Sequence, residues 1–267
     1  MTSRSDTTDA PHVTLLSTTP VKGFGLHHPD AVTLDVNGAV GDRDFFLIDN
    51  ERRLFSITRT GVFASWVATF DPGTDVLTLT HPDGTVLEDK TATGEEVVGH
   101  FDEGRDVRGF LVDGSWTRWL SELAGRPVSL VRAADPGYAF DVHPVTVVSD
   151  ASVADLGKQA PAGSIDARRF RMLMEITGVG PYEEDSWDSR TVRVGTARLR
   201  MRGPVPRCNA TTRDPDSGER NLKTLALITE RRGMLPNAEG EGLNLGVYAD
   251  VVEPGIVSVG DELRMSS

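Results

Sequence analysis

The hydrophobic positions in the first half of the chain fall into short β-like runs that are separated by turns. Asn37-Gly38 and Asp83-Gly84 are turn signals, and strand-like runs flank the second as in a β-hairpin. Strands that recur about every 8–12 residues, with no helix between them, predict a small barrel or sandwich. The runs are residues 13–17, 31–36, 44–48, 62–70, 75–80 and 107–112.

The first clear helix follows these runs. Ser115 is a candidate N-cap, Gly125 can end the helix, and the residues between them carry an apolar stripe at helical spacing. The stripe consists of Trp116, Trp119, Leu120 and Leu123. A strand over residues 126–132 comes next, and residues 133–137 have the composition of a linker. We therefore place a domain boundary at residue 132.

The second half begins with a strand at residues 144–148 that leads directly into a helix at 149–156. Further strands are expected at residues 171–177, 191–194, 197–202 and 256–259. The whole chain is thus predicted to be mainly β, with minor α in a few short helices. Its expected parts are a disordered lead (1–11) and two domains (12–132 and 133–267).

Composition narrows the classes of function. A net charge of −12 argues against a general nucleic-acid binder, whose affinity rests on a positive surface. No apolar run approaches the roughly 18 residues of a membrane span. The first ten residues lack the apolar core of a signal peptide, so we expect a cytoplasmic protein.

Cys208 is the only cysteine, and Arg202, Arg207 and Arg213 lie near it in the sequence. Neighbouring cations favour the thiolate, which is the form that binds metals and attacks electrophiles. The simpler alternative is a small buried apolar residue. A single cysteine cannot build a disulfide or an iron–sulfur site, so any electron-transfer centre of that kind must belong to a partner.

Five other residues could bind an anion. Ser149 stands at a helix start, where free N–H groups attract anions, although a plain N-cap is the alternative. Arg169 and Arg171 would share one side of an extended segment and could reach one phosphate, or could form a solvated edge. Lys22 lies on a glycine-flanked loop, and Arg59 lies on a similar one.

Several alternatives find no support. Gly178-Val-Gly180 is not followed by the third glycine and long helix of a dinucleotide site. The sequence has no nucleophile elbow and no Walker-type lysine loop. Its histidines are scattered apart from His27-His28, so we do not expect a histidine-based metal site. The acidic run at 183–185 predicts a solvated turn.

Read in order, a series of short segments resembles the MOSC family, and most closely its two-part members such as the mitochondrial amidoxime reducing component and its bacterial relatives. The central segment is Arg207-Cys208 followed by Thr211-Thr-Arg-Asp-Pro-Asp-Ser-Gly218. The others are Pro20-Val-Lys22, Gly41-Asp-Arg43, Thr58-Arg59, Val148-Ser-Asp-Ala-Ser152, Arg168-Arg-Phe-Arg171, Glu184-Asp-Ser-Trp187, Leu222-Lys-Thr-Leu225 and Leu245-Gly-Val-Tyr248.

The resemblance implies an N-terminal β-barrel domain packed on a MOSC β-barrel, with a molybdenum–pterin cofactor in the cleft between them. Cys208 would be the metal ligand. The remaining cofactor contacts would come from Lys22, Arg59, Ser149, Arg169, Arg171, Arg207 and Tyr248. Two departures bear on these contacts: Leu173 stands where relatives often carry asparagine, and Pro206 stands where a serine often precedes Arg-Cys.

The implied activity is reduction of N-hydroxylated small molecules, from N–OH to N–H, with electrons from a separate ferredoxin- or flavin-type reductase. Asp214 and Asp216 are the candidates for the proton donor. Two alternatives stay open. One is a sulfur carrier or sulfurtransferase with a persulfide on Cys208, and the other is a non-catalytic module that stores or delivers the cofactor.

Overall fold

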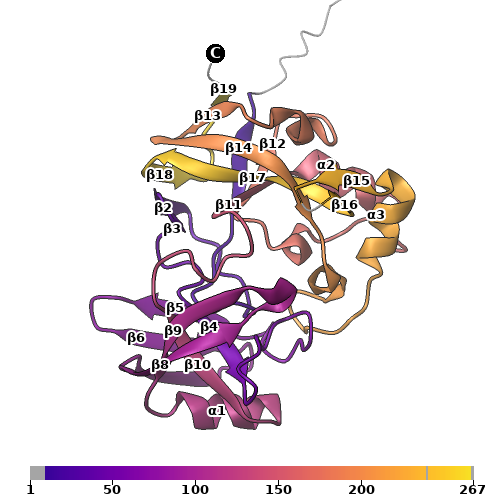
Figure 1. Cartoon of the computed structure of the whole chain (residues 1–267). Coiled ribbons are helices and arrows are strands. Elements are labelled where there is room, and N and C mark those ends of the chain that lie inside the picture. Colours follow the sequence, from indigo (N-terminus) through magenta and orange to yellow (C-terminus); the bar gives the residue numbers. More distant parts are fainter. Residues whose placement is uncertain (1–9, 239, 266–267) are drawn as a thin grey trace, which may run out of the picture.

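The computed structural model describes residues 10–238 and 240–265 (Figure 1). Strands dominate this part of the chain, which confirms the prediction of a mainly β protein with a few short helices. The helices are α1 (Trp116–Ala124), α2 (Asp150–Gly157) and α3 (Thr224–Arg232). The predicted disordered lead lies outside the described residues except for Ala10 and Pro11. No helix in the described ranges is long and apolar enough to cross a membrane.

One seven-stranded sheet forms the upper part of the molecule in Figure 1. Its order is β1 (His12–Leu16), β12 (Met174–Thr177), β11 (Val145–Ser149), β17 (Asn244–Glu253), β14 (Ala197–Pro206), β13 (Thr191–Val194) and β19 (Leu263–Met265). The two edges of this sheet meet, because His12 forms a bridge with Glu262 and Leu263 N–H donates to the Pro11 carbonyl at 2.7 Å. The sheet is therefore a closed barrel, and its interior holds residues such as Val147, Met201 and Val247 that are almost fully buried.

A small sheet lies beside this barrel. It consists of β18 (Gly255–Ser258), β2 (Ala31–Asp35) and β3 (Gly38–Ala39). The hairpin between β2 and β3 turns at Val36 and Asn37, and Gly38, the first residue of β3, has a φ of 117° that a residue with a Cβ rarely adopts. Leu34 and Val257 bury their side chains in the core of the barrel half.

The lower part of Figure 1 contains two further sheets and α1. One sheet has the order β4 (Phe45–Asp49), β10 (Val128–Ala133), β9 (Asp106–Val112) and β8 (Thr93–His100). The other is β5 (Val67–Asp71), β6 (Val76–Thr80) and β7 (Val86–Lys90). Side chains from both sheets and from α1 share one core, which includes Leu47, Leu79 and Trp116. The helix begins after Ser115 and ends at Gly125 in the left-handed conformation, as its sequence predicts.

The first strand of the chain does not lie with the sheets that follow it. β1 pairs with β12, and β2 pairs with β18, so both belong in space with the C-terminal half. Between these two strands the chain already touches the lower part, where Val21 bridges to Phe45 and Gly25 to Val67, and it enters the lower sheets themselves after β3. The division at residue 132 stays a prediction, and these pairings join residues on its two sides.

Two local predictions were wrong. Residues 167–170 form a 3-10 helix (η2, Ala167–Phe170) and Arg171 has a φ of 53°, so Arg169 and Arg171 do not alternate along a strand. The acidic run lies in a second 3-10 helix (η3, Glu183–Trp187), and Glu184 is completely buried rather than solvated. The remaining elements are η1 (Asp102–Gly104), η4 (Asn209–Thr212), β15 (Leu235–Asn237) and β16 (Gly240–Gly242).

Candidate functional site

A cleft of about 260 Å³ opens between the barrel half and the lower sheets. The lower half contributes the loops around Lys22, Ser56 and Phe101, and the barrel half contributes the segments around Asp141 and Phe170. The end of β14 closes one side through Arg207 and Cys208. Each wall therefore comes from chain segments that are far apart in the sequence.

Cys208 follows β14 directly and occupies the N-cap position of η4 in an extended conformation. Pro204 and Pro206 precede it, and the pairing of β14 with β17 is irregular on either side of Pro204. Proline cannot donate a ladder hydrogen bond, so the strand loosens here and the chain turns toward the cleft. The Cys208 side chain is exposed and lines the cleft, so it is not a small buried core residue.

Among the described residues, five cationic side chains line the cleft against two carboxyl groups, although the whole chain is strongly acidic. The cations are Lys22, Arg43, Arg105, Arg171 and Arg207, and the carboxyl groups are Asp102 and Asp141. A cleft with such an excess of positive charge concentrates anions and suits a phosphate or a similar group.

Arg207, which lines the cleft, has an incomplete set of hydrogen bonds. Its Nη2 donates to the Phe170 carbonyl and its Nη1 lies 3.3 Å from the sulfur of Met172. Its Nε is buried and makes no hydrogen bond within the described residues. Burial lowers the pKa of Arg207 below its ordinary value, against the opposing attraction of Cys208. A buried N–H donor without a partner is costly, so this group is suited to an acceptor from a bound molecule.

Arg171 and Lys22 span the two halves. Arg171 Nη2 donates to the Phe24 carbonyl at 2.7 Å, and Lys22 Nζ donates to the Ala139 carbonyl at 2.8 Å and to Asp141 at 2.7 Å. Burial, together with the nearby Arg43, lowers the pKa of Arg171 to about 10. Desolvation also lowers the pKa of Lys22, although Asp141 opposes this effect. Burying these two charges at the cleft therefore costs free energy, and a bound anion would offset that cost.

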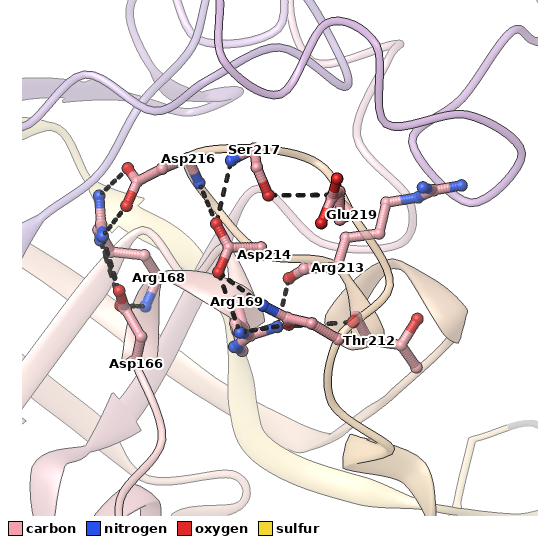
Figure 2. Close-up of polar contacts among 10 residues, drawn as sticks. Asp166, Arg168, Arg169, Thr212, Arg213, Asp214, Asp216, Ser217 and Glu219 are labelled. Atoms are coloured by element: carbon pink, nitrogen blue, oxygen red, sulfur yellow. Dashed lines mark hydrogen bonds and ion pairs between the residues drawn. The ribbon is translucent and has the colours of Figure 1, made fainter. Parts of the chain in front are cut away.

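Two predicted residues lie elsewhere. Arg59 is exposed and pairs with Asp102 at 2.9 Å. Asp102 lines the cleft, but Arg59 does not. Arg169 is buried in the loop that follows Cys208: it donates to the Arg213 carbonyl at 2.7 Å and lies 3.3 Å from Asp214 (Figure 2). In the same view the Arg168 guanidinium donates hydrogen bonds to the carboxyl groups of Asp166 and Asp216. Arg169 is thus committed to the protein's own loop.

Ser149 also lies outside the cleft. It is fully buried at the start of α2, where its hydroxyl accepts a hydrogen bond from Ser152 N–H, as an N-cap does. Its own N–H and hydroxyl donate to the two carboxyl oxygens of Glu184, at 3.1 and 3.0 Å. The Ser152 hydroxyl donates to Glu184 as well, at 2.7 Å. The predicted anion position is therefore filled by the protein's own side chain.

Tyr248 and the two departures from the family pattern do line the cleft, together with one residue that the sequence did not single out. Tyr248 is largely buried on β17, and its ring lies 5.2 Å from the ring of His143. Leu173 and Pro206 present apolar surface to the cleft. His143 lies between Asp141 and Pro144, in no recognisable motif, and only the structure brings it to the site.

Comparison with known proteins fits this geometry. The model of the MOSC domain family matches residues 138–264, which include Cys208 and most of the barrel. The predicted resemblance to the MOSC family is thus confirmed for this part of the chain. The remaining barrel strand, β1, comes from outside this range and completes the barrel from the N-terminal side.

Relatives with similar sequences extend beyond the MOSC domain. Mitochondrial amidoxime-reducing component 1 of Homo sapiens is 26% identical over 268 residues, covering 91% of this chain and 79% of that protein. Mitochondrial amidoxime reducing component 2 of Bos taurus is 31% identical over 125 residues, covering 45% of this chain and 36% of that protein. Molybdenum cofactor sulfurase of Oryza sativa subsp. japonica is 26% identical over 185 residues, covering 57% of this chain but only 22% of that protein.

Among solved structures, YuaD from Bacillus subtilis aligns with a TM-score of 0.45 at 12% identity, covering 96% of this chain and 94% of that one.

The residues around Cys208 suit a metal that brings most of its own ligands. Within the described residues, no group of three or more histidine, cysteine or acidic side chains could hold a metal ion. A metal bound to the Cys208 sulfur would therefore take its other donor atoms from a small molecule. Sulfur donors suit a soft-tolerant transition metal, and the unpartnered Arg207 Nε lies on the residue next to the thiol.

Proposed function

We propose that this chain is a molybdenum-cofactor-dependent oxidoreductase that reduces N-hydroxylated compounds with electrons from a separate reductase of the ferredoxin or flavin type. In the net reaction an N–OH substrate takes up two electrons and two protons, the N–O bond breaks, and an N–H product and water leave. Amidoxime-reducing components among the relatives, one aligned over most of this chain, support this choice of reaction.

One observation carries the proposal: the single thiol opens onto a cationic cleft between the two halves. Cys208 would hold the metal. Lys22, Arg171 and Arg207 would bind the phosphate of the pterin group, because each is cationic and lines the cleft. When bound, the molybdenum–pterin group supplies the two-electron chemistry, and the protein supplies position, charge and exclusion of water.

The apolar part of the cleft would orient the substrate. Phe140, Leu173 and Val205 line it, with the Tyr248 ring on the wall formed by β17. Apolar side chains beside a charged pocket favour a small molecule with a hydrocarbon or aromatic body and a polar head. We therefore propose a small N-hydroxylated substrate whose N–OH group points toward Cys208.

The test is molybdenum and pterin content per chain after expression in a host that makes the cofactor, together with reduction of an amidoxime by a low-potential electron donor. The wild type should carry near-stoichiometric molybdenum and pterin and should turn over. Cys208→Ser should lose the metal and the activity, because oxygen is a poorer ligand for this site. Asn209→Ala is the matched control, since Asn209 is exposed next to Cys208 and does not line the cleft.

Two results would overturn the proposal and identify its competitors. A wild type without molybdenum that releases sulfur with cyanide would be a sulfur carrier with a persulfide on Cys208. The partial match to molybdenum cofactor sulfurase makes that measurement worthwhile. Tight cofactor binding without turnover of any N-hydroxylated compound would indicate a module that stores or delivers the cofactor.

A further inference from the structure

We infer that His143, oriented by Asp250 and Arg202, is the group that delivers a proton to the N–OH group of the substrate. This inference rests on the proposed function. It starts from a chain of three side chains: His143 Nδ1 lies 2.7 Å from Asp250 Oδ1, and Asp250 Oδ2 lies 2.6 Å from Arg202 Nε. Only His143 of the three lines the cleft.

The strand pairing explains how these residues meet. β11 and β17 are antiparallel, with Val145 opposite Ala249, so the chain just before β11 runs beside the continuation of β17 where Asp250 lies. β14 flanks the other side of β17 and pairs Arg200 with Asp250, so Arg202 is on the same face of the sheet as Arg200. His143 precedes a proline, which restricts it to an extended conformation. The triad is therefore built into the barrel wall.

The partners of Asp250 determine which ring nitrogen of His143 is free. Partial burial alone would raise the pKa of the Asp250 carboxyl. Hydrogen bonds from Arg202 and His143 outweigh this effect and lower the pKa below its ordinary value. An ionised carboxylate only accepts hydrogen bonds, so Nδ1 must be the nitrogen that carries hydrogen. The other nitrogen, Nε2, carries no hydrogen in the neutral ring, so it must take up a proton before it can donate one. Such a carboxylate–imidazole pair fixes both the tautomer and the ring orientation.

The surroundings fix the orientation of the His143 ring and leave part of it accessible to water. Its ring packs 5.2 Å from the Tyr248 ring, and its side chain is 30% exposed. A ring in this position can take a proton from water at Nε2 and pass it to a molecule in the cleft, which returns the ring to its neutral form. In the reaction, one proton goes to the nitrogen and one to the leaving hydroxyl, which departs as water. His143 Nε2 supplies one of these protons, and solvent supplies the other.

Asp214 and Asp216, the proton donors suggested by the sequence, are poorly suited to this role. Neither lines the cleft. Backbone N–H groups, first that of Ser217, lower the pKa of Asp214 to about 2, so it holds no proton near neutral pH. Asp216 pairs with Arg168 at 2.8 Å. Both acids stabilise their own loop (Figure 2).

The chain offers a matched control for the variant that tests this role. His81 also has its Nδ1 near an aspartate, Asp83, at 3.0 Å, its ring also packs on an aromatic ring, Trp66, and its side chain is also 30% exposed. His81 does not line the cleft. The two histidines therefore differ mainly in place, and His143→Gln and His81→Gln can be compared directly.

His143→Gln should lower kcat about 100-fold with little change in KM, since a positioned proton donor contributes on the order of 10²–10⁴. His81→Gln should keep the activity of the wild type. Molybdenum and pterin content should stay equal in all three proteins. A wild-type kcat in His143→Gln would overturn the inference. A wild type without molybdenum or turnover would overturn the proposed function instead, so the two failures are distinct.

A second readout needs no cofactor. Nitrogen-15 NMR of the apoprotein should find the neutral His143 ring protonated at Nδ1, and Asp250→Asn should abolish that preference. Equal populations of the two tautomers in the wild type would contradict the assigned geometry. This measurement also protects the inference against a folding defect in His143→Gln, because it is made on the wild type.

Discussion

The cleft at Cys208 and the buried start of α2 look alike in the sequence, since both place donors where an anion could bind. Their structures differ in what occupies those donors. At Ser149 the N–H and hydroxyl donate to Glu184, which is fully buried and also receives a hydrogen bond from Ser152. At the cleft, Arg207 Nε is buried with no partner in the described residues.

The difference separates an internal structural site from a site that awaits a ligand. A buried anion that the protein supplies itself satisfies its donors in every molecule, and it stabilises the fold. Cations that crowd a cleft and stay partly unpaired cost stability until something binds. The two regions should therefore respond to mutation in opposite ways.

The largest effect on stability is expected at Glu184. Glu184→Ala leaves the Ser149 N–H and two buried hydroxyls without their acceptor, and each such loss costs about 1–3 kcal/mol before relaxation. Because the hydroxyls can rotate toward each other, we expect a total loss of about 3 kcal/mol in the free energy of unfolding, measured with urea. Molybdenum content per folded chain should not change, since none of these residues lines the cleft.

Glu183→Ala is the control for this prediction. Glu183 is exposed and accepts one hydrogen bond, from Gly180 N–H at 2.8 Å, so its removal should cost less than about 1 kcal/mol. A similar loss in both variants would mean that Glu184 has no special role. Loss of molybdenum in the Glu184 variant would return Ser149 to the list of cofactor contacts.

The opposite signature is expected at Arg207. Arg207→Met should lower molybdenum and pterin affinity about 10-fold or more, because a hydrogen bond to a charged group is worth about 1.5–3 kcal/mol. The apoprotein should lose less than about 1 kcal/mol of stability, since the apolar side chain no longer has a charge to bury. Equilibrium dialysis against the cofactor measures the first quantity, and urea unfolding of the apoprotein measures the second.

Arg198→Met is a close control. Arg198 also has a buried Nε that finds no partner in the described part of the chain, but its guanidinium pairs with Glu253 on the neighbouring strand and does not line the cleft. Cofactor content should be that of the wild type in this variant. If both arginine variants lose the cofactor equally, a buried unpaired Nε does not identify the binding site.

Local signals in the sequence were sufficient for much of the fold. The Asp83-Gly84 hairpin joins β6 and β7, and the stripe around Trp116 and Leu120 forms α1. The sequence did not single out α3 or β17. The sequence also predicted an extended segment where η2 forms, because nothing in the local pattern indicates that Arg171 adopts a positive φ.

The candidate site was predictable only in part. The resemblance selected Cys208, Lys22 and Arg207 together, and these residues do line one cleft. It also selected Ser149, whose partner Glu184 lies 35 residues away, in a run whose sequence predicts a solvated turn. His143 was missed for a related reason, since its partner Asp250 is 107 residues distant. Contacts of this range depend on strand pairing, which single-sequence patterns do not specify.

The smallest effect concerns the pH dependence of the empty cleft. Desolvation lowers the pKa of Lys22 below 10.5, so between that lowered value and 10.5 the unfolded chain holds more protons than the folded one. Stability of the apoprotein should therefore rise as pH increases through this window, by at most about 1.4 kcal/mol per pH unit from this group. At lower pH the cost of the buried charge is fully present and constant.

Lys22→Met should remove this contribution to the pH dependence of stability. Lys90→Met, which changes an exposed lysine on β7, should leave the pH dependence as in the wild type. Urea unfolding from pH 8 to 10.5 compares the three proteins, and an unchanged slope in Lys22→Met would show that Asp141 already offsets the burial of the charge.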